Sequence, residues 1–256
     1  MAKPFVGTRA KILLLDIETS PNIVYSWGLF NQNISIQQVI EPTKVLSWAA
    51  KWYGHPDTMF ASLKQRKPLQ MIGKIHKLLD EADIVVHYNG KSFDVKHLQR
   101  EFLEYGFPPP SPFKQVDLLT TARSQFKFLS NKLQYILGAL ELGEKADTGG
   151  FATWIGCLKG NAESWEKMRR YNIQDVTEME KLYTKLLPWI KGHPNVALYQ
   201  ADKQVCTNCG SEDFQKRGYH TANTYKYAKY SCNTCRKWFR GVKSEGGRQN
   251  QFTGAV

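Results

Sequence analysis

The sequence predicts an α/β protein followed by a small cysteine-rich module. Short apolar runs typical of buried strands alternate with longer segments of helical periodicity. The hydrophobic content of 42%, with 12% aromatic residues, is sufficient for a packed core in a chain of 256 residues. Two Cys-x-x-Cys pairs lie close to the C-terminus and indicate a metal-stabilised module there.

The N-terminal half is expected to consist mainly of strands. Four consecutive aliphatic residues at 12–15 are typical of a buried central strand. The elements expected in this half, in order, are strands at 12–15, 23–30 and 44–53, a strand extension or hairpin arm at 33–40, a helix at 69–80 and a strand at 84–86.

The next hundred or so residues are expected to be mainly helical. The elements expected here, in order, are a helix at 93–105 with Ser92 as N-cap, a strand at 116–119 leading into a helix, a helix from a Ser130 cap to Leu142, a loop at 147–150, a helix at 151–158 and a long helix at 162–187 with Asn161 as N-cap. Cys157, on the short helix, is interpreted as a core thiol.

Two acids stand where the first strand ends. Asp16 and Glu18 are two positions apart, so strand alternation places their side chains on one face, roughly 7 Å apart at the backbone. At that separation both carboxylates can lean toward one divalent cation. The alternative is that the strand has simply reached solvent.

A third acid, Asp94, falls in the first turn of a predicted helix. The helix dipole favours an acid there by roughly 0.3–1 kcal/mol, so this position alone does not require a function. Asn89, in the preceding turn, is equally explained by the geometry of a strand-to-helix connection.

A fourth acid lies on the core-facing side of the longest predicted helix. Tyr171 and Asp175 are four residues apart and interrupt its apolar stripe on the same side. A carboxylate is expensive to bury unless a cation or a hydrogen-bond network receives it. Asp175 therefore indicates an inward-facing site.

The three motifs Asp16-Ile-Glu18, Asn89 with Phe93-Asp94, and Tyr171-x-x-x-Asp175 together resemble the DEDD superfamily of exonucleases in its tyrosine subtype. No histidine lies in the four or five residues before Asp175, so the histidine subtype does not fit. The resemblance covers about residues 9–187 and implies a ribonuclease H-like fold, with a mixed β-sheet flanked by helices.

The resemblance also implies a two-metal site for phosphodiester hydrolysis at a 3′ end. Two divalent ions roughly 3.5–4 Å apart can activate a water and stabilise the leaving alkoxide, and oxygen-only ligands favour Mg²⁺ or Mn²⁺. By this resemblance Asp16 contacts both ions, Glu18 and Asp175 complete the site of the attacking water, and Asp94 holds the second ion directly or through water. Tyr171 is expected to orient that water.

Contacts to the terminal nucleotide are a further expectation from the resemblance. The candidates are Thr19, Asn89 and Phe93, which flank the predicted acids along the chain. The direction of digestion, from the 3′ end, is likewise implied by the family, because the spacing of the motifs gives no information about direction.

The cysteines form two pairs separated by 22 residues, which is the pattern of a tetrahedral Cys₄ zinc site and resembles a zinc ribbon. The four expected ligands are Cys206, Cys209, Cys232 and Cys235. Gly210 follows the first pair but Arg236 follows the second, which leaves the second turn's geometry open. One structural Zn²⁺ is expected, because four thiolates leave no open position for substrate.

The C-terminal part is basic. Residues 195–256 hold ten Lys and Arg against four Asp and Glu, a net charge of +6 within the chain's +12. Lys226, Lys229, Arg236 and Lys237 alternate with aromatic residues, a composition suited to single-stranded nucleic acid. The alternatives are that the aromatics form the module's small core, or that the module docks a protein.

The predicted domains are an exonuclease domain at 1–190, a linker at 191–204, a zinc ribbon at 205–243 and a disordered tail at 244–256. No signal peptide and no membrane span are expected, which predicts a cytoplasmic location with reduced cysteines. The pI of about 9.4 indicates a polyanionic partner.

The leading hypothesis is a 3′-5′ exonuclease acting on DNA, with a single-stranded 3′ end preferred and a role in replication or repair. One alternative is an RNA 3′-end-processing nuclease, since the same acids serve both polymers. Another is a non-catalytic nucleic-acid-binding adaptor. The presence of all four acids and Tyr171 argues against the adaptor, and the sequence makes no prediction of oligomeric state.

Overall fold

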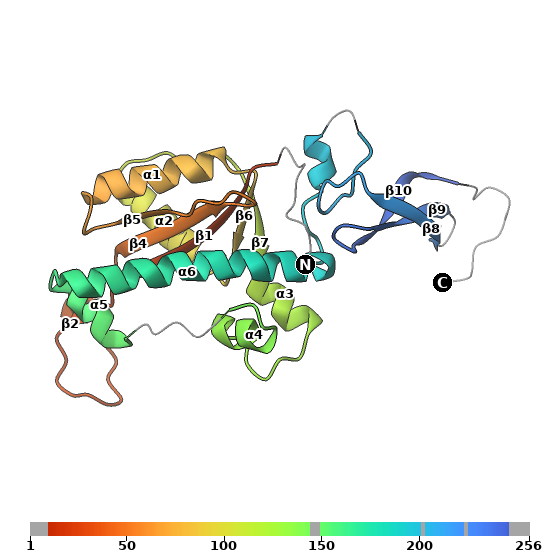
Figure 1. Cartoon of the computed structure of the whole chain (residues 1–256). Helices are drawn as coiled ribbons and strands as arrows, with labels where there is room; N and C mark the ends of the chain where they lie inside the picture. Colours follow the sequence, from red (N-terminus) through yellow and green to blue (C-terminus); the bar gives the residue numbers. More distant parts are fainter. Residues whose placement is uncertain (1–9, 144–148, 201–202, 223–224, 246–256) are drawn as a thin grey trace. The chain divides into compact units, whose positions relative to one another are not determined.

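A computed structural model of the protein describes residues 10–143, 149–200, 203–222 and 225–245. The chain divides into two compact units (Figure 1). The first unit is Ile12–Leu182, and the second combines Met1–Lys11 with Tyr183–Val256.

A five-stranded mixed sheet forms the centre of the first unit, with the strand order β5-β4-β1-β6-β7. The central strand β1 pairs antiparallel with β4 and parallel with β6. The strands are β1 (Ile12–Thr19), β4 (Val45–Trp52), β5 (Met59–Ser62), β6 (Ile84–His87) and β7 (Lys114–Asp117). The aliphatic run at the start of β1 is buried because the sheet is covered on both faces.

Helices lie on both sides of this sheet. They are α1 (Pro68–Glu81), α2 (Asp94–Glu104), α3 (Leu118–Gln125), α4 (Leu133–Ala139), α5 (Phe151–Leu158) and α6 (Ala162–Leu186). The side chains of α1 and α2 pack with Leu13, Leu15 and Ile17 of β1. Helix α6 covers the opposite face, as Figure 1 shows, and meets Asp16 there. The predicted α/β class is confirmed, with a mixed sheet flanked by helices.

The strand predicted at 23–30 is mostly wrong. Only β2 (Ile23–Val24) forms, and it pairs with β3 (Val39–Glu41) beyond the 3₁₀ helix η1 (Ile36–Gln38). The apolar residues that favoured a strand are exposed: 99% for Trp27 and 93% for Leu29. Strand propensity reflects packing on a pleated surface, and these side chains have no such surface in the first unit.

Two predicted helix starts also differ. Ser92 does not cap α2, because its hydroxyl donates to the Asn89 side chain at 2.8 Å instead of accepting from the helix. Phe93 is the N-cap residue. The helix predicted from Ser130 to Leu142 is the shorter α4, and Glu141, at φ 55°, turns the chain out of the helical path.

Other predicted boundaries agree closely with the structure. Asn161 caps α6, with its Oδ1 accepting the Ser164 N–H at 2.8 Å, and Cys157 is buried in the core. The apolar stripe of α6 is buried as predicted at Trp165, Met168, Val176, Met179, Leu182, Tyr183 and Leu186. Of the loop predicted at 147–150, residues 147 and 148 lie outside the described residues.

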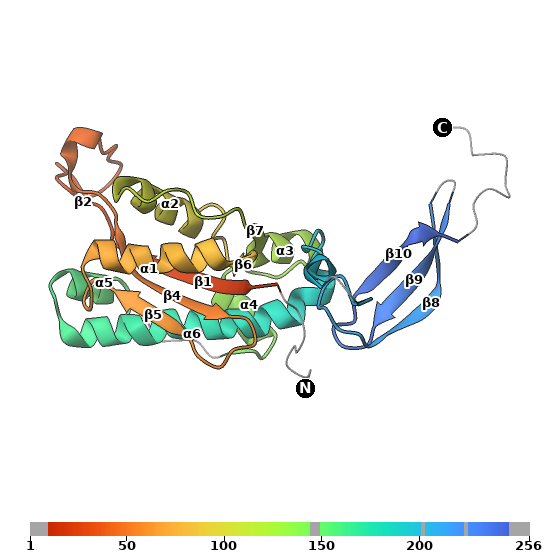
Figure 2. The same cartoon turned by 90° about the horizontal axis from the view of Figure 1, so that it is seen from above.

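The second unit contains a three-stranded antiparallel sheet of order β10-β9-β8 (Figure 2). Its elements are the 3₁₀ helices η2 (Leu187–Trp189) and η3 (Val196–Tyr199) and the strands β8 (Phe214–Thr221), β9 (Lys226–Cys232) and β10 (Trp238–Ser244). The described part of the segment predicted as a linker contains η3, and the Val196 N–H donates to the Thr207 carbonyl at 2.9 Å.

The predicted disordered tail begins inside β10, which ends at Ser244, and Glu245 follows with an ion pair to Lys216. Residues 246–256 lie outside the described residues. Among the helices that the structure describes, none has the length and apolar character needed to cross a membrane.

Candidate active site

Asp16, Glu18 and Asp175 come together on one face of β1. Each offers a carboxylate oxygen, and these oxygens lie within 4.8 Å of one another. Asp16 and Glu18 share the face because they are two residues apart on a strand. Asp175 reaches it from α6, the helix that covers this side of the sheet. The structure thus joins acids from the start and the end of the first unit.

The Asp94 side chain is hydrogen-bonded to the backbone of the same strand. Its Oδ1 accepts the Ile17 N–H at 3.0 Å, and the residue is buried. Strand β6 pairs with β1 only as far as Leu14, so no neighbouring strand serves Ile17 on that side. Asp94, in the first turn of the helix that follows β6, supplies the missing acceptor. It lies outside the group of three close oxygens.

Burial and crowding raise the pKa of all four carboxyls. Burial is the largest cause for each, and repulsion from Asp94, Glu18 and Asp175 adds to it in holding the pKa of Asp16 well above its usual range. The pKa is about 8 for Glu18, about 7 for Asp94 and about 6 for Asp175. Near neutral pH the four cannot all ionise without a compensating charge.

No Lys or Arg in the described part of the chain forms an ion pair with any of these four acids. The described residues therefore provide no ion pair that would compensate these charges. The donors are carboxylate oxygens only, a set that suits Mg²⁺ or Mn²⁺ better than Zn²⁺. The residues present fit a divalent metal site.

Tyr171 lies one helical turn before Asp175, and its hydroxyl lowers the pKa of that carboxyl against the effect of burial. Burial, followed by the nearby acids, raises the pKa of the Tyr171 phenol well above its usual range. The hydroxyl is therefore a proton donor in hydrogen bonds at neutral pH and is unsuited to act as a base. Its ring is held edge-on by Trp154, with 6.3 Å between the centroids.

Asn172 is a site residue that the sequence interpretation missed. Its Nδ2 donates to Asp16 Oδ2 at 2.6 Å, its Oδ1 accepts from Ser47 Oγ at 3.1 Å, and it is fully buried. The hydrogen bond lowers the pKa of Asp16, against the effect of burial. A possible signal was its position three residues before Asp175, because residues three apart on a helix share a face.

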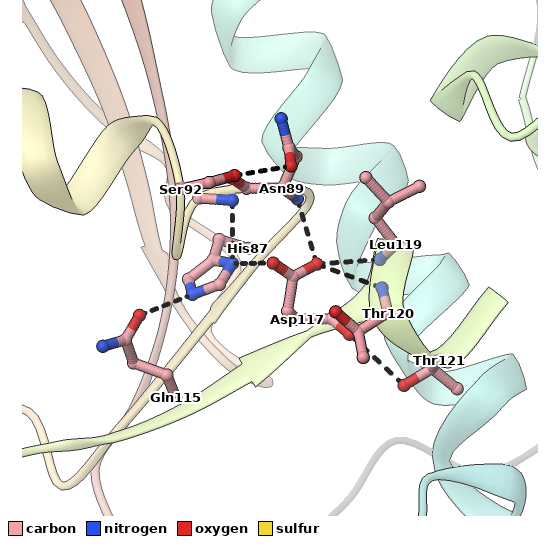
Figure 3. A network of polar contacts seen from close by, with 9 residues as sticks. His87, Asn89, Ser92, Gln115, Asp117, Leu119, Thr120 and Thr121 are labelled. Atoms are coloured by element: carbon pink, nitrogen blue, oxygen red, sulfur yellow. Dashed lines mark hydrogen bonds and ion pairs between the residues drawn. The ribbon is translucent and has the colours of Figure 1, made fainter. Parts of the chain in front are cut away.

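The turn between β6 and α2 is held by Asp117, as Figure 3 shows. Asp117 Oδ1 accepts the Asn89 N–H at 3.1 Å, and Oδ2 lies 3.6 Å from His87 Nδ1. Nδ1 also accepts the Gly90 N–H at 3.0 Å, while Nε2 lies 3.1 Å from Gln115 Oε1. Burial lowers the pKa of His87, so the imidazole is neutral with its proton on Nε2.

The predicted nucleotide contacts flank the acids. Thr19 follows Glu18 at the end of β1, and Phe93, 39% exposed, precedes Asp94. Asn89 is exposed and has a φ of 68°, a left-handed conformation that Asn tolerates better than most residues. These residues flank the acids along the chain, and their contacts to a nucleotide stay a prediction.

A second cluster of potential metal ligands lies in the second unit. Sulfur atoms approach to 3.7 and 3.5 Å in two pairs, and all four lie within 4.8 Å of one another. Hydrogen bonds from neighbouring thiols lower the pKa of two of the four, Cys206 and Cys232. The cluster consists of Cys206, Cys209, Cys232 and Cys235, a donor set that fits Zn²⁺.

The two turns that carry these thiols have the same backbone geometry. The Gly210 N–H donates to the Cys206 carbonyl at 2.8 Å, and the Arg236 N–H donates to the Cys232 carbonyl at 3.0 Å. Gly210 has φ 71° and Arg236 has φ 64°. Arg236 therefore adopts a conformation that costs a non-glycine residue about 1–2 kcal/mol, and the second turn is not altered by the missing glycine.

The predicted basic contacts have different surroundings. Lys237 Nζ donates to two backbone carbonyls around η2, at 3.2 and 2.8 Å. Lys226 and Lys229 lie over aromatic rings, 3.9 and 5.1 Å from the centroids. Arg236 is exposed. Lys237 is thus engaged in packing its own unit, whereas the others face outward in part.

Comparison with known proteins gives a family and a fold. Residues 13–187 match a family described as the RNase_H superfamily. None of the curated proteins matches the sequence. Among solved structures, the family B DNA polymerase of the hyperthermophilic archaeon Pyrobaculum calidifontis is similar with a TM-score of 0.52 at 16% identity, covering 70% of this chain and 25% of the polymerase.

RNase D of Trypanosoma brucei has a TM-score of 0.46 at 17% identity, covering 75% of this chain and 62% of that one. Its complex with the RNA U12 has a TM-score of 0.43 at 16% identity, covering 73% and 58%. The chain thus spans a quarter of the polymerase and about three-fifths of RNase D.

Proposed function

The chain belongs to the RNase H superfamily, and on this basis we propose that it is a metal-dependent 3′-5′ exonuclease of the DEDD type, in its tyrosine subtype. The proposed substrate is DNA with a single-stranded 3′ end. The observation that carries the proposal is the meeting of Asp16, Glu18 and Asp175 within 4.8 Å, with Asp94 bound to the same strand. Such a buried cluster destabilises the fold and marks a functional site.

Two divalent cations are part of this proposal. Asp16 would hold both, Glu18 and Asp175 would complete the site beside the attacking water, and Asp94 would hold the second ion. Bound Mg²⁺ or Mn²⁺ would supply the positive charge that acidifies a water molecule and stabilises the leaving alkoxide. The raised pKa values of the acids support this, since binding of a divalent cation favours their ionised forms.

The chain's own residues position the reactants. Tyr171 is proposed to orient the attacking water by donating its hydroxyl hydrogen, because its phenol stays protonated beside Asp175. Asn172 holds the Asp16 carboxylate in one orientation through the 2.6 Å hydrogen bond. The proton of the attacking water leaves to solvent or to a carboxylate, because the phenol of Tyr171 is already protonated.

The terminal nucleotide is proposed to contact Thr19, Asn89 and Phe93. The Phe93 ring is partly exposed beside Asp94 and offers a stacking surface for a base. The Asn89 turn is held by Asp117, so this contact is positioned before substrate binds. Preorganisation of this kind reduces the entropy lost on binding.

The second unit is proposed to be a zinc ribbon that helps to hold the strand. Four thiols within 4.8 Å, in turns of matching geometry, support one structural Zn²⁺. Binding of zinc would supply most of the folding free energy of so small a module. Candidate contacts to the strand are the basic residues Lys226, Lys229, Arg236 and Lys237. The proposed domain limits are 1–190 for the nuclease and 205–243 for the ribbon.

Hydrolysis of RNA is the principal alternative within the same chemistry. The acids act at the phosphodiester, so a preference for DNA or RNA depends on contacts to the 2′-hydroxyl. A non-catalytic adaptor is the alternative from another class. It would have no need of four carboxyls whose raised pKa values reflect a strained, buried cluster.

The test is nucleotide release from 3′-labelled single-stranded DNA with Mg²⁺ or Mn²⁺, alongside RNA of the same sequence. Faster release from DNA is expected, and the ratio of rates assigns the substrate. Asp16→Ala and Asp175→Ala should abolish release while leaving binding largely intact, because each removes a proposed metal ligand.

Asp57→Ala provides a matched control for the loss of an acid. Asp57 is exposed in the loop after β4. Trp52, the last residue of β4, pairs with Leu13 near the start of β1, so this loop lies at the opposite end of β1 from Glu18. This variant should cleave like the parent protein. Normal turnover in Asp16→Ala would refute the site assignment, and binding without cleavage of either polymer would favour the adaptor.

A further inference from the structure

The three-stranded sheet of the second unit sorts its side chains onto two faces. Side chains alternate along each strand, and residues paired across antiparallel strands lie on the same face. The strand register assigns to a first face, here called the Phe214 face, the residues Phe214, Lys216, Tyr219, Lys226, Tyr230 and Phe239. It assigns to a second face, here called the Trp238 face, the cationic and aromatic residues His220, Tyr227, Lys229, Trp238 and Arg240, with neutral polar residues between them.

The Phe214 face is occupied by the sheet's own packing. The rings of Phe214, Tyr230 and Phe239 contact one another, with centroids 5.4–5.6 Å apart. Lys216 forms an ion pair with Glu245 at 2.9 Å. This face therefore presents an internal aromatic cluster and, beyond it, the partly exposed Tyr219 ring under Lys216 and Lys226. Both of these cations interact with the Glu245 carboxylate.

The Trp238 face carries cationic, aromatic and neutral polar side chains. Trp238 is 51% exposed, and the Lys229 Nζ lies 5.1 Å from the centre of its ring. The Arg240 guanidinium lies 4.2 Å from the centre of the Tyr227 ring. None of the side chains that the register assigns to this face is acidic. Within the described part of the chain, neither Lys229 nor Arg240 forms an ion pair.

This combination selects a ligand with negative charges and flat apolar groups in alternation. Cations without carboxylate partners remain available to phosphates. An exposed indole and a guanidinium stacked on a phenol ring both offer planar surfaces on which bases can stack. The cations already rest against rings of the neighbouring strand, so less side-chain entropy is lost on binding. The two strands concerned, β9 and β10, lie side by side in Figure 2.

We propose that the Trp238 face is the surface through which the second unit binds single-stranded nucleic acid. Lys229 and Arg240 meet phosphates, and Trp238 and Tyr227 meet bases. A duplex is a poorer ligand because its bases are already stacked and paired. The inference rests on the proposed nuclease function and deepens it, because it assigns the strand to one side of the sheet. It replaces the contact proposed above for Lys226, which lies with Lys216 and Tyr219 on the Phe214 face.

The test is fluorescence anisotropy of a labelled (dT)₂₀ probe with the full chain carrying Asp16→Ala, so that the probe is not digested. Trp238→Ala in this background should weaken binding by roughly 5- to 150-fold, the range for loss of one stacked base. Lys229→Gln and Arg240→Gln should each reduce the slope of log affinity against log salt concentration by about 0.7, the value for one phosphate contact with a single strand.

The matched controls lie on the other side of the same sheet. Tyr219→Ala and Lys216→Gln make the same kinds of change on the Phe214 face and should leave both affinity and salt slope unchanged. Trp238→Phe keeps an aromatic ring and should restore most of the binding. Zinc content, measured for every variant, separates loss of a contact from loss of the fold.

Two results would overturn the inference. In one, Trp238→Ala and the two charge variants retain full zinc and bind the probe as tightly as the parent. The Trp238 face would then be assigned to a protein partner. In the other, Tyr219→Ala and Lys216→Gln weaken binding as much as the Trp238-face variants. Cleavage by the protein without Asp16→Ala is measured separately, so binding through the Trp238 face without cleavage would refute only the nuclease.

Discussion

Glu18→Gln should stabilise the protein without Mg²⁺ or Mn²⁺ while abolishing turnover. The folded state raises the pKa of Glu18 from 4.5 to about 8, first through burial and then through repulsion from Asp175 and Asp94. A raised pKa contributes stability that is fully present below about pH 4.5 and is lost as pH rises toward 8. Near pH 7.5 keeping this group protonated costs about 4 kcal/mol at most, at 1.36 kcal/mol per pH unit. Glutamine removes that cost.

The assay is calorimetric unfolding of both proteins at pH 5 and pH 8, without chelator so that the zinc proposed for the cysteine cluster is not removed. At pH 8 the Gln variant should melt roughly 5–15 °C above the parent, from about 2–4 °C per kcal/mol for a domain of this size, and at pH 5 the difference should nearly vanish. Added Mg²⁺ should stabilise the parent more than the variant. Glu166→Gln, on the exposed side of α6, is the control and should change little.

The reasoning would be refuted by a parent protein whose melting temperature rises from pH 5 to pH 8, or by a Gln variant that melts with the parent at both. Either result would mean that the acids are not crowded in the folded state. Loss of turnover alone would not show whether the acids are crowded in the folded state. The test therefore uses thermal stability measured without Mg²⁺ or Mn²⁺.

Asn172→Ala should lower the free energy of unfolding by about 1.5–3 kcal/mol, the range for a hydrogen bond to a charged group. It should also reduce turnover, because the Asp16 carboxylate loses its hydrogen-bond donor. Denaturant unfolding and rates at several Mg²⁺ concentrations measure the two effects, and an unchanged unfolding midpoint would contradict the prediction. Cys206→Ser should lose zinc and unfold the second unit while the first unit stays folded, which metal analysis and hydrogen exchange would detect; full zinc content would contradict it. Gly90→Ala should destabilise by about 1–3 kcal/mol, because the added Cβ would lie 2.5 Å from His87 Cγ; wild-type stability would show that the turn can relax.

The sequence was sufficient for the elements whose signals are local. The aliphatic run of β1 predicted a central strand, and alternation then placed Asp16 and Glu18 on one face. The apolar stripe of α6 predicted which side of the helix is buried, and therefore that Asp175 points inward. Periodicity of this kind depends only on neighbours within a few residues, so it can be recognised in a single sequence.

Local signals failed where a residue's partner lay elsewhere. The composition of residues 23–30 favours a strand, but Trp27 and Leu29 stay exposed and do not pack against the described part of the first unit. Ser92 has the composition of an N-cap, but its hydroxyl bonds to the Asn89 side chain. In both cases the outcome depends on tertiary contacts, which local propensity does not describe.

The sequence by itself determined the chemistry available to this protein: which side chains could ligate metal, and in what order along the chain they occur. Only the tertiary structure decided which of them meet. Asn172 reaches Asp16 across 156 residues, and Asp94 serves Ile17 because β6 is too short to do so. Such pairings depend on strand order, strand length and the helix that covers the sheet, none of which is encoded in the spacing of the residues concerned.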